Sequence, residues 1–349
     1  MDDALVLESL AEVLAASLAR TEGNLLVTPR AADLVVRRRD VARRRSSMYF
    51  VGTRDEQQPR WVVKEPHPEV TQLGLRPPVP AADQLVALQR LHGHLRDDEA
   101  FHCPMPLGLL AGHSAFAMTF VRGRPVSQAA RSAPLGSRGS DLMFGMHCAA
   151  MALQRVHGVD AVTERVLDID EEQSLLESAR TTLEGCAVHP DDAWFQPRLA
   201  GPVRARELTL HGDWAPENVL VGPEGVHILD PELAVRGLPE QDLARFLVML
   251  FDPPVFTVAG RLSSVRRGRR NAARTFLQSF GLSSDDAAVL RPVLVNAICA
   301  RWAVREGYMR AESHRAGGEL LRTRRALVRA HFASLLDEVT TSWPQVYLG

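Results

Sequence analysis

Several features that mark whole classes of protein are missing from this sequence. It has only four cysteines in 349 residues, with no Cys-x-x-Cys pair and no metal-ligand spacing, so we expect reduced thiols and neither a disulfide framework nor a zinc site. No apolar run approaches the roughly 18 residues that a membrane helix needs. The start, Met1-Asp2-Asp3, lacks the positive charge of a secretory signal. We therefore expect a cytoplasmic protein with no membrane partner.

Net charge is also almost absent, because 41 basic residues meet 42 acidic ones and leave a formal charge of −1. Such a chain has no global field that attracts nucleic acid, so no nucleic-acid partner is expected. Lysine is scarcer still: Lys64 is the only one, and every other basic residue is arginine. Lysine carries a compact point charge and arginine a planar fork, so the two are not interchangeable where a phosphate is bound tightly. Lys64 is therefore a candidate phosphate contact.

The chain is long enough to bury more than one core, and its predicted elements change character along the way. Apolar residues at helical spacing predict a helix over 4–19. Strand-like stretches follow near 33–36, 46–51 and 60–64. The last two are separated by a polar turn, which predicts an antiparallel hairpin. A helix over 82–95 and a strand pair that ends at 116–121 complete this first part.

Beyond Arg122-Gly-Arg-Pro125, which breaks the last of these strands, helices predominate. Helices are predicted over 142–157, 171–184, 243–251 and 269–280, with two or three more before the end. One short β region is expected among them, over 208–235. The sequence thus predicts an α+β fold with a small β-rich lobe over 1–121 and a larger helical lobe over 122–349.

The residues expected to do chemistry lie close together, within 208–230. Two short apolar strands in this stretch are joined by Gly222-Pro-Glu-Gly225, a hairpin connection. In an antiparallel hairpin the start of the first strand lies beside the end of the second, so Asn218 and Asp230 are expected at the same edge. Their side-chain oxygens suit Mg²⁺. Asp213 lies five residues before Asn218 and can accept the proton of a substrate hydroxyl.

This order, Asp-x4-Asn followed by an Asp after a hairpin, is the arrangement of catalytic and metal residues in protein kinases. The stretch from His211-Gly-Asp213 to Asp230-x-Glu232, with the tail Gly237-x-Pro-x-x-Asp242-Leu-Ala, more closely resembles the aminoglycoside phosphotransferase and choline-kinase-like family. The resemblance extends over most of the chain. It implies the bilobal protein-kinase-like fold and transfer of the ATP γ-phosphate to a hydroxyl of a small molecule.

The resemblance also implies roles for single residues of this sequence. Asp213 would be the catalytic base or the carboxylate that orients the acceptor hydroxyl. Asn218 and Asp230 would bind the Mg²⁺ that bridges the ATP phosphates. Lys64 matches the strand lysine that reaches the nucleotide phosphates.

Other residues would act around these. Met118 and Phe120 fall in the linker whose backbone meets adenine. Asp242 and His211 would support the catalytic loop, and His157 closes a Leu-x-x-Val-His segment that resembles the end of the helix before the substrate region.

Two features depart from the family pattern. The usual lysine partner is a glutamate on the following helix, but counting back from Leu88 gives Gln84 with Asp83 beside it, and Glu69 is a remote alternative. Asp83 is the candidate partner of Lys64. Because an aspartate side chain is shorter than that of the usual glutamate, the ion pair would be remodelled, water-bridged or absent. The loop over 37–45 has six arginines and no glycine, which favours a solvated basic turn over direct phosphate contact.

These departures keep a second function open, a nucleotide-binding pseudokinase that acts as an interaction module. A protein kinase is disfavoured because no Asp-Phe-Gly and no Ala-Pro-Glu follows Asp230. The acceptor stays open among sugars, aminoglycoside-like antibiotics and other natural products, as does ATP against GTP. Acidic residues over 160–177 would suit a cationic acceptor, but an acidic helix start explains them better. The basic run over 261–274 lacks aromatics and favours a solvated helix face.

Overall fold

A computed structural model of the chain describes residues 3–20, 30–40, 46–67, 79–110, 112, 114–132, 139–252, 257, 262–313 and 318–343. The chain divides into two compact units. The N-terminal unit comprises Met1–Gly123 together with Gly222–Ala234, and the C-terminal unit comprises Arg124–Val221 together with Val235–Gly349. The domain division after residue 121 stays a prediction.

The N-terminal unit is built on a five-stranded sheet with the order β1-β2-β3-β6-β5. Its strands are β1 (Leu34–Asp40), β2 (Ser46–Thr53), β3 (Trp61–Pro66), β5 (Pro106–Leu109) and β6 (Phe116–Thr119). All neighbours in this sheet are antiparallel. The hairpin expected from the polar turn is confirmed as β2–β3, with Val51 opposite Trp61 at its closed end.

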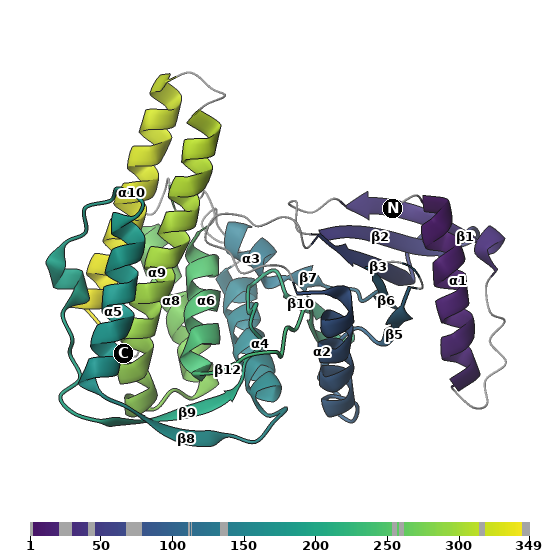
Figure 1. The fold of residues 1–349 in the computed structure, drawn as a ribbon, viewed down its shortest axis with the longest axis horizontal. Helices are drawn as coiled ribbons and strands as arrows, with labels where there is room; N and C mark the ends of the chain where they lie inside the picture. Colours follow the sequence, from purple (N-terminus) through teal and green to yellow (C-terminus); the bar gives the residue numbers. More distant parts are fainter. Residues whose placement is uncertain are drawn as a thin grey trace. The chain divides into compact units, whose positions relative to one another are not determined.

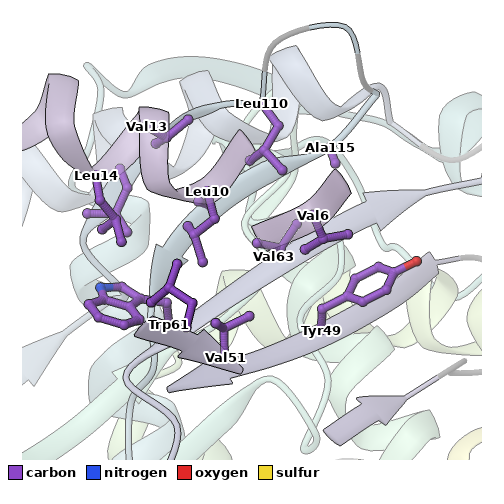
Figure 2. Packing of buried hydrophobic residues seen from close by; sticks show 13 residues of the cluster. Val6, Leu10, Val13, Leu14, Tyr49, Val51, Trp61, Val63, Leu110 and Ala115 are labelled. Carbon is purple, nitrogen blue, oxygen red and sulfur yellow. The ribbon is translucent and has the colours of Figure 1, made fainter. Parts of the chain in front are cut away.

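Helix α1 (Asp3–Arg20) covers one face of this sheet (Figure 2). Val6, Leu10 and Val13 recur at helical spacing and are buried together with Tyr49 of β2 and Trp61 of β3. This buried cluster is the core of the N-terminal unit. Burying each large apolar side chain in it stabilises the fold by roughly 1.5–3 kcal/mol. The helix predicted over 4–19 is confirmed.

The opposite face of the sheet carries the predicted nucleotide residues. Side chains alternate between the two faces of a strand, so with Trp61 and Val63 toward α1, Val62 and Lys64 point to the other face. Met118 stands directly opposite Val62 in the β3–β6 register, and paired residues share a face. Lys64 and Met118 therefore lie on the same face of the sheet, the one that α1 leaves uncovered.

The segment Gly222–Ala234, which comes much later in the chain, completes the N-terminal unit. Helix α2 (Ala81–His94) forms where a helix was predicted and leads to β4 (Phe101–His102), which pairs in parallel with β11 (Gly225–Ile228). Gly225 has φ +118°, and a Cβ there would come within 2.6 Å of the Ala100 carbonyl oxygen. This close approach requires glycine, and it brings Asp230, two residues beyond β11, into the unit that contains Lys64.

The C-terminal unit is mostly helical (Figure 1). Its helices are α3 (Val126–Ser132), α4 (Gly139–His157), α5 (Ile169–Glu184), α6 (Pro239–Phe251), α8 (Ser263–Phe280), α9 (Ser284–Ser313) and α10 (Gly318–Thr341), with a short 3₁₀ turn at Asp192–Phe195. The four helices predicted by range are confirmed, each with an earlier start. A short antiparallel pair joins β7 (Arg124–Pro125) to β10 (Val219–Gly222). Sheet-rich and helical parts together make the predicted α+β fold.

One sheet of this unit was not foreseen. Strands β12 (Arg236–Gly237), β9 (Val203–Thr209) and β8 (Thr163–Leu167) form a three-stranded antiparallel sheet, although only one short β region over 208–235 was expected. Both longer strands are rich in charged residues, and the sequence reasoning predicted no strand over most of either one. Cross-strand contacts such as that between Arg165 Nη1 and Glu207 Oε2, at 4.0 Å, exist only once the two distant segments meet.

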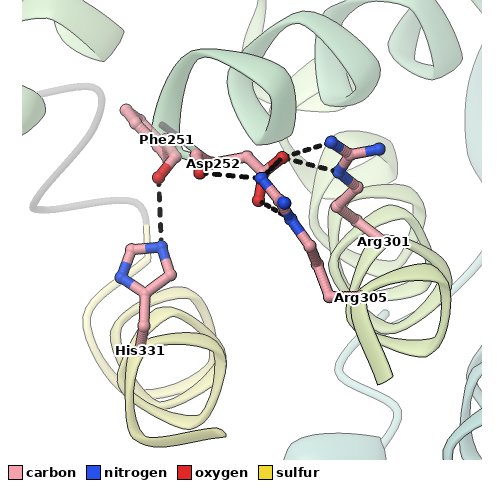
Figure 3. Close-up of polar contacts among 5 residues, drawn as sticks. All are labelled: Phe251, Asp252, Arg301, Arg305 and His331. Atoms are coloured by element: carbon pink, nitrogen blue, oxygen red, sulfur yellow. Dashed lines mark hydrogen bonds and ion pairs between the residues drawn. The ribbon is translucent and has the colours of Figure 1, made fainter. Parts of the chain in front are cut away.

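Arginine pairs join the helices of this unit. Three carboxylates are each held by two arginines from another helix: Asp252 by Arg301 and Arg305, Glu338 by Arg269 and Arg270, and Glu306 by Arg325 and Arg329. Figure 3 shows Asp252 between Arg301 and Arg305. The Arg305 Nε–H donates to Asp252 Oδ1 at 2.7 Å. Buried carboxylates need such charge-assisted bonds. Arg269 is 3% exposed, so at this point the basic run over 261–274 is buried instead of solvated.

Among the described helices, α9 alone has the length and apolar composition to cross a membrane. Within its stretch Ser284–Ala311, the most apolar window of 18 residues reaches a mean hydropathy of 1.4. We expected no stretch long and apolar enough to cross a membrane, and α9 contradicts that expectation by its length and composition. However, 67% of its most apolar window is buried inside the protein, which is typical of a core helix. The expected cytoplasmic location stays a prediction.

Glu240, in the first turn of α6, makes the stability of the protein depend on pH. Its side chain is 1% exposed, and burial raises its pKa from 4.5 to about 7. Because the folded protein holds this proton more tightly than the unfolded chain, stability falls as pH rises from about 4.5 to about 7 and stays reduced above that. We expect Glu240→Gln to remove this cost and to raise the free energy of unfolding at pH 8 by on the order of 2 kcal/mol.

Urea unfolding of Glu240→Gln and wild type at pH 5 and pH 8 checks this expectation. The gain should appear at pH 8 and shrink strongly at pH 5, where the wild-type carboxyl is protonated in the folded state. Glu184→Gln, an exposed position on α5, is the matched control and should show no gain at either pH. A gain of equal size at both pH values would contradict the titration of Glu240.

Candidate active site

Asp213 lies in a loop, residues 211–218, between β9 and β10 of the C-terminal unit. This loop is held by Asp242 of α6, whose carboxylate accepts the backbone N–H groups of His211 at 2.8 Å and Gly212 at 3.1 Å. Burial by itself would raise the pKa of Asp242, but its hydrogen bond with His157 and the nearby His211 hold that pKa below the usual range. Asp242 is therefore ionised and supports the loop backbone, the role implied by the resemblance.

His157, at the end of α4, anchors Asp242 from the other side. Its Nε2 lies 3.0 Å from Asp242 Oδ2, and both side chains are buried. An ionised carboxylate only accepts hydrogen bonds, so the His157 Nε2–H donates. The end of α4, the first turn of α6 and the 211–218 loop are thereby tied through one carboxylate.

Aromatic contacts fix the loop from within. His211 is fully buried, its Nδ1 lies 3.3 Å from the backbone nitrogen of Asp213, and its ring meets the edge of Trp214 at 4.9 Å between centroids. Trp214 in turn packs against Phe246 of α6, which stacks on Phe276 of α8 at 4.3 Å. The loop is thus packed against α6, which in turn packs on α8.

The Asp213 side chain meets a residue that the sequence reasoning did not single out. Arg245 of α6 donates to Asp213 Oδ1, and the two side chains are 38% and 27% exposed. The signal was present, because positions three apart lie on the same face of a helix and Arg245 follows Asp242 by three residues. The positive charge beside Asp213 is therefore supplied by the same helix that holds the backbone of His211 and Gly212.

Asn218 stands immediately before β10, as expected. Its Nδ2 donates to the backbone oxygen of Asp213 at 2.8 Å, which leaves the amide oxygen as the atom available for a ligand. Asp213 and Asn218 are thus brought together in the C-terminal unit. An amide oxygen is among the hard oxygen ligands that Mg²⁺ accepts, so this side chain fits the predicted metal role.

Asp230 and Lys64 meet in the N-terminal unit. Lys64 is 7% exposed, and its Nζ lies 2.9 Å from Asp230 Oδ1. Asp230 has φ 53°, a left-handed conformation that costs free energy in a residue other than glycine and is typical of functional positions. Its carboxylate is 36% exposed, so it can offer an oxygen to a metal. The lysine partner is thus an aspartate that lies 166 positions further along the chain.

The other candidate partners of Lys64 lie elsewhere. Asp83 is exposed, and no ion pair joins it to Lys64 in the described part of the chain. Gln84 donates from Nε2 to the Val79 carbonyl oxygen at 2.6 Å. Glu69 lies outside the described residues, as does 41–45 of the arginine-rich loop.

The predicted adenine linker begins at Met118, inside β6, in the N-terminal unit. Met118 is 8% exposed, on the sheet face that also carries Lys64. Phe120 packs edge-to-face on Phe50 at 6.0 Å between centroids, and its backbone N–H donates to the Arg60 carbonyl oxygen at 2.7 Å. The backbone of this segment is thus held against β3, and its role toward adenine stays a prediction.

Protein side chains by themselves form no cluster of metal ligands in the described part of the chain. Within the described ranges, no group of three or more His, Cys, Asp or Glu side chains could hold a metal ion. The sequence instead predicts an amide oxygen from Asn218 and a carboxylate from Asp230 as metal ligands, and this pairing stays a prediction.

Comparisons with known proteins bear on the whole chain. A model of the phosphotransferase enzyme family matches residues 38–275. Among solved structures, a glucosamine kinase (crystal form B) has a TM-score of 0.52 at 18% identity, covering 94% of this chain and 85% of that one. A glucosamine kinase in complex with glucosamine, ADP and inorganic phosphate gives 0.51 at 17% identity, with 94% and 82% covered. Choline kinase from Cryptosporidium parvum gives 0.50 at 10% identity, with 98% and 99% covered.

At these identities the likeness concerns the fold alone. No curated protein matches the sequence.

Proposed function

We propose that this chain, which belongs to the phosphotransferase enzyme family, is a kinase that transfers the γ-phosphate of ATP, with Mg²⁺, to a hydroxyl of a small molecule. The acceptor would be a sugar, an aminoglycoside-like antibiotic or another natural product. The observation that carries the proposal is the 211–218 loop, in which Asp242 holds the backbone while Asp213 and Asn218 stay in contact with each other.

Each residue has a defined task in this reaction. Lys64 would bind phosphate oxygens of the nucleotide, and Asn218 and Asp230 would hold Mg²⁺, which when bound neutralises charge on the phosphates. Asp213 would orient the acceptor hydroxyl and accept its proton as the new bond to phosphorus forms. Phosphoryl transfer depends mainly on such positioning and charge stabilisation, so a rigidly held loop is what the chemistry needs.

The acidic residues over 160–177 do not favour a cationic acceptor. Asp168 caps α5 by accepting the backbone N–H groups of Asp170 at 3.1 Å and Glu171 at 3.0 Å. Glu172 is 1% exposed and bonds Arg291 Nη1 at 2.9 Å. These side chains serve the start of the helix and its packing, so they give no argument for a cationic acceptor.

A pseudokinase is the second candidate, and one observation favours it. Lys64 is paired with Asp230 directly, and the glutamate expected on the helix after the lysine is replaced by Gln84 with the exposed Asp83. A lysine without a helix partner is a departure from the family pattern. Both candidates predict nucleotide binding, but only the kinase requires Mg²⁺ and transfers phosphate.

Titration calorimetry of ATP binding, with and without Mg²⁺, on wild type and Asp230→Ala tests the proposed function. We expect Mg²⁺ to strengthen binding and Asp230→Ala to remove at least tenfold of that gain, because the variant lacks a metal-binding carboxylate. Metal-free binding should change little, since losing Asp230 leaves Lys64 able to contact phosphate. Asp97→Ala, an exposed position after α2, is the matched control and should behave as wild type.

The outcomes separate the candidates. If binding falls equally without metal, Asp230 is a structural residue and its metal role is wrong. If ATP binds equally well without Mg²⁺, the pseudokinase is favoured. If neither ATP nor GTP binds to wild type, the nucleotide-dependent function itself is wrong.

A further inference from the structure

A cavity of about 690 Å³ in the C-terminal unit has no role in the function proposed above. Its wall is formed by β8, β9, the last turns of α4 and α8, and the start of α9. Among the described residues, those that line it all belong to this unit, and none belongs to the 211–218 loop. Small-molecule sites in proteins have volumes of about 300–1,000 Å³, so the cavity is large enough for a ligand of its own.

Two long side chains of opposite charge line this cavity from neighbouring strands. Glu164 of β8 stands opposite Arg206 of β9, and Arg204 precedes Arg206 by two positions. Alternate residues of a strand share a face, so Arg204 lies diagonal to Glu164 on the face that lines the cavity. Diagonal neighbours in a sheet are about 7–8 Å apart. The carboxylate and the guanidinium can therefore bind two different groups of one ligand.

The two arginines of β9 differ in their contacts. Arg206 Nη2 lies 3.3 Å from Asp286 Oδ1, and Asp286 also accepts the Ser283 backbone N–H at 3.0 Å at the start of α9. Arg204 and Glu164 are exposed, and within the described ranges neither side chain makes a hydrogen bond or an ion pair. Their charges are thus available to a ligand, whereas that of Arg206 serves the packing of α9 on β9.

A buried hydrogen-bond acceptor belongs to the same wall. His157 lines the cavity, its side chain is 6% exposed, and its Nε2–H donates to Asp242. The other ring nitrogen, Nδ1, is buried and has no hydrogen-bond partner among the residues that the structure describes. In a neutral ring whose Nε2 carries the proton, Nδ1 is an acceptor. Because a buried polar atom without a partner costs free energy, a donor from a ligand would be favourable here.

The balance of charges in the wall restricts the chemistry of the ligand. The cavity is lined by three carboxylates and two guanidiniums, those of Glu164, Asp285, Asp286, Arg204 and Arg206. A purely anionic ligand would meet more negative than positive groups, and a purely cationic one would leave the Arg204 guanidinium unused. No group of three or more His, Cys, Asp or Glu side chains in the described part of the chain could hold a metal ion. A small ligand that carries both charges fits this wall best.

The remainder of the wall includes apolar side chains. Val162, Leu208 and Phe280 line the cavity, and Val162 is half-exposed. Ligand sites typically combine such apolar surface with a few polar groups that fix the orientation of the ligand. An apolar body next to the two charged groups would therefore add to binding.

We propose that this cavity binds a free α-amino acid with an apolar side chain. The ammonium group of the amino acid would be held by the Glu164 carboxylate, with His157 Nδ1 as a neutral acceptor. Its carboxylate would bind the planar fork of Arg204 through parallel hydrogen bonds. Such a ligand has no alcohol hydroxyl and cannot be the acceptor of the proposed kinase, so this inference does not rest on the proposed function.

Calorimetric titration of the full chain with L-phenylalanine tests the proposal, together with two analogues that each lack one charge. Phenethylamine has no carboxylate, and 3-phenylpropionate has no ammonium group. We expect wild type to bind L-phenylalanine more tightly than either analogue by on the order of tenfold, because each analogue loses one hydrogen-bonded charge contact.

Variants of the two charged residues should act on different analogues. Arg204→Gln is expected to weaken L-phenylalanine by on the order of tenfold and to leave phenethylamine unchanged, since that analogue offers nothing to Arg204. Glu164→Gln should weaken L-phenylalanine by a similar factor and leave 3-phenylpropionate unchanged. Arg266→Gln on α8 and Glu184→Gln on α5, both at exposed positions outside the cavity wall, are the matched controls and should bind all three compounds as wild type does.

Thermal unfolding without ligand verifies that the variants are folded. Arg204→Lys keeps the charge but lacks the planar fork, so it should bind L-phenylalanine with an affinity between those of wild type and Arg204→Gln. It carries the test if Arg204→Gln does not fold.

Three results would overturn the proposal. The first is that folded wild type does not bind L-phenylalanine. The second is that Arg204→Gln and Glu164→Gln bind it as wild type does, which would place the amino acid elsewhere. The third is that magnesium ATP displaces it, which would assign it to the nucleotide site. Failure of wild type to bind ATP would contradict the proposed function alone and would leave this inference standing.

Discussion

Replacing Asp213 by asparagine is expected to reduce phosphoryl transfer to an acceptor hydroxyl by on the order of 10²–10⁴-fold, the contribution typical of a positioned acid or base. The amide has nearly the same shape but cannot take a proton from the hydroxyl. Affinity for magnesium ATP should stay within a factor of about three, because the residues proposed to bind phosphate and metal, Lys64, Asn218 and Asp230, are unchanged.

The measurement is a steady-state assay with a panel of hydroxylated acceptors, together with calorimetry of magnesium ATP binding on the same samples. Asp170→Asn, an exposed position in the first turn of α5, removes the same charge from the same unit and serves as the matched control. Full turnover by Asp213→Asn would remove Asp213 from its role. Loss of ATP binding together with transfer would show that the residue maintains the loop instead.

The second large effect is expected at Lys64. Lys64→Arg keeps the charge, yet we expect it to lower kcat/KM for ATP by on the order of 100-fold. The side chain is 7% exposed and stands opposite Met48 and Phe116 in neighbouring strands, so a larger planar fork would have to be accommodated among buried neighbours. Its bond to Asp230 is a single contact at 2.9 Å, a geometry that suits a point charge.

Forcing the larger group into this position should also destabilise the protein by about 1–3 kcal/mol, so thermal unfolding is measured beside activity. Arg96→Lys, an exposed position just after α2, tests the reverse exchange in the same unit and should leave both quantities unchanged. An active Lys64→Arg protein would contradict the argument that one lysine was kept because arginine cannot replace it.

Local patterns were sufficient for much of the fold. The helix at 3–20, the β2–β3 hairpin and α2 follow from apolar spacing and one polar turn, because these contacts involve residues close in sequence. The apolar residues of α1 are buried once the helix packs on a sheet, and the next three predicted strands provide that sheet.

The pairing of segments that are far apart in the sequence could not be predicted in this way. The β8–β9 ribbon joins segments about 40 residues apart, and its strands carry alternating charge whose cross-strand partners are invisible in either segment alone. Likewise, Gly225 and the β4–β11 pairing place Asp230 in the N-terminal unit, beside a lysine far away in sequence.

By itself, the sequence determined the class of fold, and it predicts the chemistry-bearing residues, since Asp213, Asn218, Asp230 and the lone Lys64 stand in an order that few functions require. Only the tertiary structure decided their partners. Lys64 pairs with Asp230 and not with Asp83, and Asp213 faces Arg245, because charged side chains are matched across packed elements that sequence spacing does not connect. The identity of a residue is given by the sequence, whereas the charged neighbour that it contacts is determined by how the elements pack.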